Sequence, residues 1–240
     1  MRIPLNPCYI LHQRAYRETS LILDLFSRDH GKVAVLAKGA RRAKSGIASL
    51  VQLHQRLIIS WSGKGELGTL TGVEADGKAL NINGRRLMVA FYLDELLMRL
   101  LHRHEGHPEL FDAYDLALEQ LNRGEAEHPL LRAFELQLLN SLGYGLVLGH
   151  AADSGAKIDP GREYYYRMDY GPVSNRPGDA NWIKVSGRVL NALQAGDYSD
   201  GELMKEAKHL TQTVLRELLG PRPLASRELY AAYLKTRGTE

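Results

Sequence analysis

The chain has 240 residues, of which 44% are hydrophobic and 25% are charged, as is ordinary for a soluble globular protein. No run approaches the ~20 apolar residues that a membrane span needs, and the N-terminus lacks the apolar core of a secretory signal. The one cysteine, Cys8, excludes an internal disulfide. We therefore expect a cytoplasmic protein with no membrane contact.

The first third of the chain has the pattern of a small β-structure. Short strand-like runs are separated by turn signals such as those at 28–31 and 62–65. The five runs lie at 8–14, 20–27, 32–37, 52–61 and 67–74. Their number and length favour a closed barrel of the OB-fold type over residues 1–80, and a two-sheet sandwich fits the same pattern.

From about residue 85 the apolar spacing becomes helical. Helices are predicted over 85–104, 108–122 and 129–142, then from Ser186 and from a capping box at 199–202, with a last one near Ser226. Residues 145–180 break this pattern with many Gly, Pro and Asp, which indicates a small irregular or β insert. The fold class is therefore α+β and multidomain, with a barrel at 1–80 and a helical domain at 81–240.

A basic loop leaves the third predicted strand. Four cations fall within seven positions, with a glycine and no acid among them: Lys38, Arg41, Arg42 and Lys44. Residues 1–82 hold 12 Lys+Arg against 6 Asp+Glu, and the rest of the chain holds 19 against 22. The positive field therefore belongs to the N-terminal third, where a polyanion such as a nucleic-acid backbone would be drawn.

Other cations and aromatic residues flank the same strands. The weaker candidates for phosphate contacts are Arg14, Arg28, Lys32 and Arg56. Tyr16 and Trp61, at strand ends, are candidates for stacking on bases, because OB-folds hold single strands in cationic grooves with aromatic platforms. A barrel that binds structured RNA fits the basic loop equally well, and so does an adaptor whose helical domain carries the function.

Catalytic motifs are incomplete. The glycines at 63–68 precede a strand rather than a helix, and the near P-loop at 72–79 ends in Ala79 instead of Ser or Thr. His102, His104 and His107 form a cluster that a metal-dependent hydrolase could use, but Pro108 stands where the HExxH motif needs its second histidine. We expect no catalytic residue, no metal and no cofactor, with the hydrolase kept as an alternative.

Several segments occur together, and in order, in one bacterial family. They are Glu18-Thr19-Ser20, Leu25-Phe26, Gly31-Lys32, Ala37-Lys38-Gly39-Ala40-Arg41-Arg42 with Lys44-Ser45, Phe134-Glu135-Leu136, Leu142-Gly143-Tyr144 and Ser226-Arg227. Through them the chain resembles the RecO family of recombinational repair mediators along nearly its whole length.

This resemblance implies an N-terminal OB-fold, a helical domain and no enzymatic activity. It also implies binding of single- and double-stranded DNA, annealing of complementary strands, and cooperation with RecR in loading RecA onto single strands covered by SSB. Finally, it implies binding of the acidic, hydrophobic C-terminal tail of SSB. Such a tail needs an apolar pocket with a cationic rim, for which Arg132, beside Leu131 and Phe134, is our candidate.

One departure from the family concerns zinc. Many RecO-like proteins carry two CxxC pairs after the Leu-Gly-Tyr segment, and here the first pair would fall at Ala151 and Ser154. With no thiolate available, we expect the insert at 145–180 to hold together by packing, through Tyr164, Tyr165, Tyr166 and Trp182.

Overall fold

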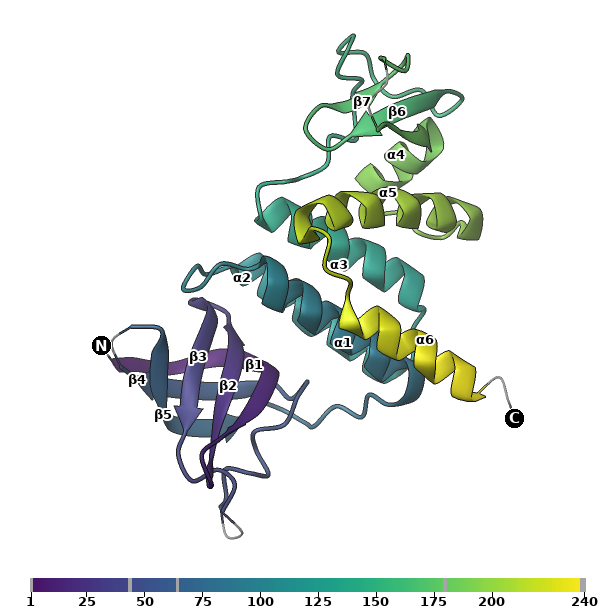
Figure 1. Cartoon of the computed structure of the whole chain (residues 1–240). Helices are drawn as coiled ribbons and strands as arrows, with labels where there is room; N and C mark the ends of the chain where they lie inside the picture. Colours follow the sequence, from purple (N-terminus) through teal and green to yellow (C-terminus); the bar gives the residue numbers. More distant parts are fainter. Residues whose placement is uncertain (1, 43–44, 64, 179–180, 238–240) are drawn as a thin grey trace. The chain divides into compact units, whose positions relative to one another are not determined.

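A computed structural model describes residues 2–42, 45–63, 65–178 and 181–237. The chain forms two compact units, one of residues 1–125 with 223–240 and the other of residues 126–222 (Figure 1). This grouping differs from the change of secondary structure near residue 80 on which the predicted domain boundary rests, and that boundary stays a prediction.

The first unit begins with a closed five-stranded barrel, as the fold prediction required. Its strands are β1 (Arg2–Tyr16), β2 (Ser20–Ser27), β3 (Gly31–Ala37), β4 (Leu57–Ser62) and β5 (Leu67–Ala75). The order is β1-β2-β3-β5-β4, and β4 pairs with β1 to close the barrel. Closure excludes the two-sheet sandwich. The fourth strand starts at Leu57 rather than at 52, because residues 51–56 form a loop.

The barrel core follows from strand alternation. Leu23 and Leu25 of β2 point inward and join Ile10, Val35 and Ile59 in a buried apolar cluster. Phe26, the residue after Leu25, is equally buried but points outward, where its ring lies 5.4 Å from that of Phe111. Strand β2 is therefore packed on both of its faces, which explains its nearly continuous apolar run.

Three helices complete the first unit: α1 (Gly84–Leu100), α2 (Pro108–Arg123) and α6 (Ala225–Arg237). Helix α1 ends at Leu100, four residues before the predicted end. Helix α2 begins with Pro108 in its first turn and ends at Arg123, and the following Gly124 takes the left-handed conformation (φ 79°) typical of a residue that ends a helix.

The second unit contains α3 (Glu127–Ser141), a small antiparallel sheet, α4 (Gly187–Ala195) and α5 (Gly201–Leu219). The sheet has the order β7-β6-β8, from β6 (Glu163–Arg167), β7 (Gly171–Val173) and β8 (Ile183–Ser186). Ser186 caps α4 as predicted, whereas the cap of α5 is Asp200, one residue after the predicted Ser199. Tyr164 and Tyr166 are buried in this region, and Trp182 packs against Arg167.

Candidate nucleic-acid interface

One end of the barrel joins the β1–β2 turn to the loop that follows β3. The backbone N–H of Arg41 donates to the Thr19 carbonyl oxygen at 2.8 Å, and that of Gly39 donates to the Ser20 hydroxyl at 3.4 Å. Gly39 has a φ of +70°, which disfavours other residues. The basic loop is therefore held against the turn mainly by its own backbone, while its cationic side chains remain exposed. We call this surface, formed by Arg14, Tyr16, Arg17, Lys38, Arg41 and Arg42, the basic end.

The cations of the basic end are exposed. Lys38, Arg41 and Arg42 are all exposed, and so is Arg14 near the end of β1. Within the described part of the chain, none of these four pairs with a carboxylate. Lys44, the fourth cation of the predicted loop, lies outside the described residues. The structure thus brings together four of the eight predicted phosphate contacts.

Arg17 belongs to the same surface and was missed by the sequence prediction. It sits in the β1–β2 turn with a left-handed backbone (φ 53°), and its carbonyl accepts from Arg41 Nη1 at 3.5 Å. Its guanidinium carbon lies 5.4 Å from the centre of the Tyr16 ring. The charge of Arg17 was visible in the sequence, but the proximity of the turn to residue 41 depends on strand pairing.

The three remaining candidates lie toward α1 and α2 instead. Arg28 forms a two-pronged pair with Asp112, with Nη2 2.9 Å from Oδ2. Arg56 pairs with Asp76 at 2.7 Å and with Asp115 of α2. These guanidiniums already have carboxylate partners, so they form a different set from the cations of the basic end.

Lys32 is held in the same region. Its Nζ donates to the Met98 carbonyl at 2.6 Å, and partial burial, with a smaller contribution from Arg103, lowers its pKa. The preceding Gly31 has a φ of +60°, and a Cβ there would lie 1.8 Å from the Glu105 carbonyl oxygen. The close approach of the Glu105 backbone therefore explains the glycine at position 31, and the Met98 carbonyl explains the position of the Lys32 side chain. Neither needs a bound phosphate.

Most aromatic residues of the barrel are unavailable for stacking. Tyr9 and Phe26 pack against the rings of Phe111 and Tyr114 under α2. Trp61 is only 7% exposed and meets His30 edge-on. Tyr16 is partly exposed, and it alone of the four aromatic residues in 2–42 and 45–63 lies at the basic end.

The predicted histidine cluster forms part of the connection between α1 and α2. The His104 backbone N–H donates to the Lys32 carbonyl oxygen at 3.1 Å, which ties this connection to the barrel. Among the described residues, no group of three or more His, Cys, Asp or Glu side chains could hold a metal ion. The geometry therefore gives the hydrolase alternative no support.

In the second unit, Arg132 lies inside the protein rather than at a rim. Its Nε and Nη2 donate to Glu135 at 3.0 and 2.6 Å, and Thr211 of α5 donates to the same carboxylate at 2.6 Å. Arg132 and Phe134 are buried, and Leu131 is partly exposed. Nη1 of Arg132 is buried without a hydrogen-bond partner among the described residues.

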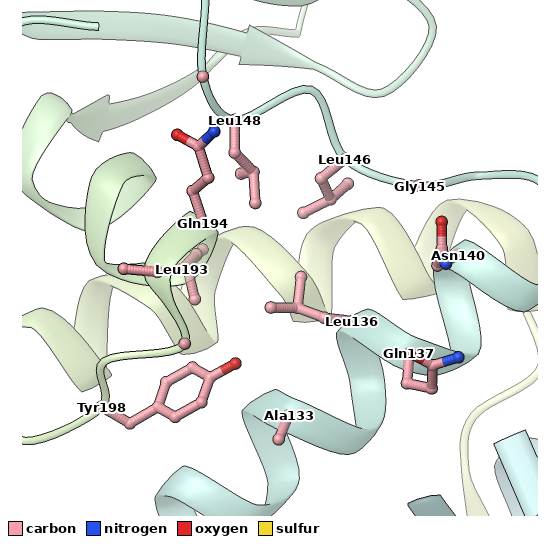
Figure 2. Close-up of a pocket in the computed structure, with 13 residues that line it drawn as sticks. Ala133, Leu136, Gln137, Asn140, Gly145, Leu146, Leu148, Leu193, Gln194 and Tyr198 are labelled. Atoms are coloured by element: carbon pink, nitrogen blue, oxygen red, sulfur yellow. The ribbon is translucent and has the colours of Figure 1, made fainter. Parts of the chain in front are cut away.

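A pocket lies on the adjacent stripe of α3, as Figure 2 shows. Leu136 of α3, Leu146 and Leu148 of the following segment, and Leu193 of α4 supply its apolar walls. Tyr198 stands at its edge; burial raises the pKa of its phenol, and the nearby Arg132 charge opposes that rise. The side chains that sequence analysis missed here lie up to 62 positions from Leu136, beyond the reach of a local pattern.

Comparison with known proteins decides the family. The family "Recombination protein O N terminal" matches residues 1–77, and "Recombination protein O C terminal" matches residues 83–228. The chain belongs to the RecO family.

Individual relatives agree with this assignment. A "DNA repair protein RecO" of Aromatoleum aromaticum is 43% identical over 228 residues, which cover 95% of each chain. One from Methylococcus capsulatus is 45% identical over 229 residues, covering 95% of this chain and 93% of the relative. The predicted resemblance is confirmed.

Membership of the RecO family makes the protein a non-enzymatic recombination mediator in DNA repair, and this confirms the prediction that the chain is not an enzyme. In the described part of the chain no helix is long and apolar enough to cross a membrane. Ala151 and Ser154, the positions at which the sequence resemblance placed a first zinc-binding pair, are buried and exposed, respectively.

Proposed function

We propose that the protein binds single- and double-stranded DNA through its basic end, anneals complementary strands, and acts with RecR to help load RecA onto SSB-coated single strands in the cytoplasm. The observation that carries the proposal is the group of exposed arginines and lysine that backbone hydrogen bonds hold beside the β1–β2 turn. Family membership supports the mediator role.

The mechanism is electrostatic. Two complementary strands repel each other through their phosphates, and a surface that neutralises several phosphates lowers that barrier. Base pairing then drives the reaction, so nucleotide hydrolysis is unnecessary. Lys38, Arg41 and Arg42 are the main phosphate contacts of this proposal, with Arg14 as a neighbour and Lys44 retained from the sequence.

The test is annealing of complementary oligonucleotides coated with SSB, measured at increasing salt. We expect the protein to accelerate annealing at low salt and to lose this effect as salt rises. Acceleration that is independent of salt would contradict an electrostatic mechanism. Competition with RNA of equal length tests the RNA-binding alternative, which predicts tighter binding of structured RNA than of single-stranded DNA.

We further propose that the SSB tail binds the second unit, at the pocket beside Arg132. The four leucines that line this pocket offer an apolar surface for the hydrophobic end of the tail. Arg132 stays in the proposal only as the sequence-based candidate for a carboxylate of the tail, because its side chain is buried and is not among those that line the pocket.

Two leucine substitutions test this partner site. Leu146→Glu places a charge in the pocket wall, whereas Leu116→Glu changes a leucine that is 52% exposed on α2. We expect the first to weaken binding of a fluorescent tail peptide by about tenfold or more and the second to leave it unchanged. Equal affinities of the two variants would remove the pocket from the proposal.

A further inference from the structure

Tyr16 occupies a position that phosphate binding alone does not explain. It ends β1 opposite Ser20, and Arg14, two residues earlier, lies opposite Ile22. Because side chains alternate along a strand, Arg14 and Tyr16 lie on one face of β1. Across β2, Leu21 and Leu23 point into the barrel, so Ser20 and Ile22, and with them Tyr16 and Arg14, point outward.

The same register places the basic loop beside this tyrosine. Leu21 pairs with Ala37 at the end of β3, so the next residue, Lys38, follows opposite Ser20. Tyr16 and Lys38 are therefore separated by two strand spacings, about 10 Å, on the outer surface. A strand whose phosphates contact the loop would thus bring its bases toward the ring.

Arg17 completes the arrangement. Its guanidinium carbon lies over the Tyr16 ring, 5.4 Å from the centroid, and the residue is exposed, so it adds a cation beside the aromatic ring. The backbone of this turn is fixed at two points, since the carbonyls of Arg17 and Thr19 both accept hydrogen bonds from Arg41. A pre-positioned aromatic ring beside a cationic loop is the feature that binds unpaired bases in single-strand-binding barrels.

We propose that Tyr16, with the Arg17 guanidinium beside it, is a stacking site for an unpaired nucleobase, which makes the basic end prefer single strands over duplex. This inference rests on the proposed function, because it needs a strand bound at the basic end. Bases inside a duplex are stacked on their neighbours and do not reach the ring, whereas phosphates are available in both forms.

The experiment compares three probes of equal length with the full chain: oligodeoxythymidine, an abasic strand with the same phosphates, and a duplex. Tyr16→Ala is expected to weaken binding of oligodeoxythymidine by about fivefold or more, and to leave the abasic strand and the duplex unaffected. Tyr16→Phe keeps the ring and is expected to bind like the unmodified protein. Circular dichroism of both variants verifies that the barrel is folded.

Two results would overturn the stacking site. One is an equal loss on the abasic strand, which would mean that Tyr16 only positions the loop. The other is an equal loss for Tyr16→Phe, which would assign the effect to the hydroxyl. Failure of the proposed function looks different, since the unmodified protein would then bind none of the three probes at low salt.

Discussion

Arginines of the barrel differ in what they contact, and this decides what each can do. Arg41 is exposed, and the contacts described for it are with backbone carbonyls. Arg56 lies between two carboxylates, those of Asp76 and Asp115, with its guanidinium 5.9 Å from the centre of the Phe111 ring. A guanidinium already paired with carboxylates adds little to the attraction of a phosphate.

We predict that Arg56→Ala lowers the free energy of unfolding by about 1–2 kcal/mol, because it leaves the carboxylate of Asp115 with one donor fewer. The same variant should keep the salt dependence of DNA binding. Urea unfolding and DNA titration measure the two effects separately. A flatter salt dependence for Arg56→Ala would return this residue to the DNA-binding set.

Arg132 is a second residue whose role follows from burial. Breaking a buried ion pair leaves an uncompensated charge, so Arg132→Ala should destabilise the protein by about 3–5 kcal/mol. The matched control is Arg123→Ala, whose pair with Glu119 is exposed and should cost about 0.5 kcal/mol or less. Comparable urea midpoints for the two variants would contradict the buried pair.

Among the elements, α6 depends on a carboxylate from a distant helix. Glu95 of α1 accepts from the backbone N–H groups of Ala225 and Ser226 at 2.9 and 2.8 Å, and from the Ser226 hydroxyl at 2.6 Å. Partial burial acts to raise the pKa of Glu95, but the hydrogen bonds from Ser226 and Ala225 and the charge of Arg99 act more strongly in the other direction. The net effect is a pKa below the ordinary value of 4.5. Glu95 thus supplies the N-terminal cap that α6 takes from another part of the chain.

This cap predicts a pH-dependent contribution to stability. Because the pKa is lower in the folded state, the contribution is fully present above about pH 4.5 and is lost as the pH falls through the folded pKa. Glu95→Gln should cost about 1 kcal/mol at neutral pH, and the difference from the unmodified protein should shrink in acid. Urea unfolding at a series of pH values measures it; a difference that grows in acid would contradict the assignment.

Local sequence patterns predicted the strands and helices better than they predicted which side chains contact one another in the folded protein. Alternating apolar residues and turn signals gave the five strands, and helical spacing gave α1 to α3, because both signals lie within about ten residues of sequence. The same patterns could not separate Arg28 and Arg56 from Arg41. Their partners Asp112 and Asp115 lie 84 and 59 positions away, and only strand closure and helix packing bring them together.

The site in the second unit shows the same limit. Arg132 was the candidate for the cationic rim of a tail pocket because it lies beside Leu131 and Phe134, but the structure buries it. Its partner Glu135 also accepts from Thr211 of α5, which lies 76 positions from Glu135 and so outside any local pattern. Whether Arg132 contacts the SSB tail stays a prediction. The structure adds Arg17 to the barrel surface for a related reason, since its turn meets residue 41 only through the β2–β3 pairing.

For the whole molecule, we propose two binding sites: the basic end of the barrel for DNA phosphates, and the pocket of the second unit for the SSB tail. The two sites differ in chemistry, so changes at one should leave the other intact. Leu146→Glu should therefore bind DNA normally, and variants at Arg41 and Arg42 should bind the tail peptide normally. Loss of both activities in either variant would point to misfolding or to a shared surface.

The salt dependence of single-strand binding tests the central claim most directly. Each phosphate contact contributes about 0.7 to the slope of log affinity against log salt, so Arg41→Ala with Arg42→Ala should flatten the slope by about 1.4. Arg56→Ala, measured in parallel, should keep the full slope. An unchanged slope in the double variant would contradict the account.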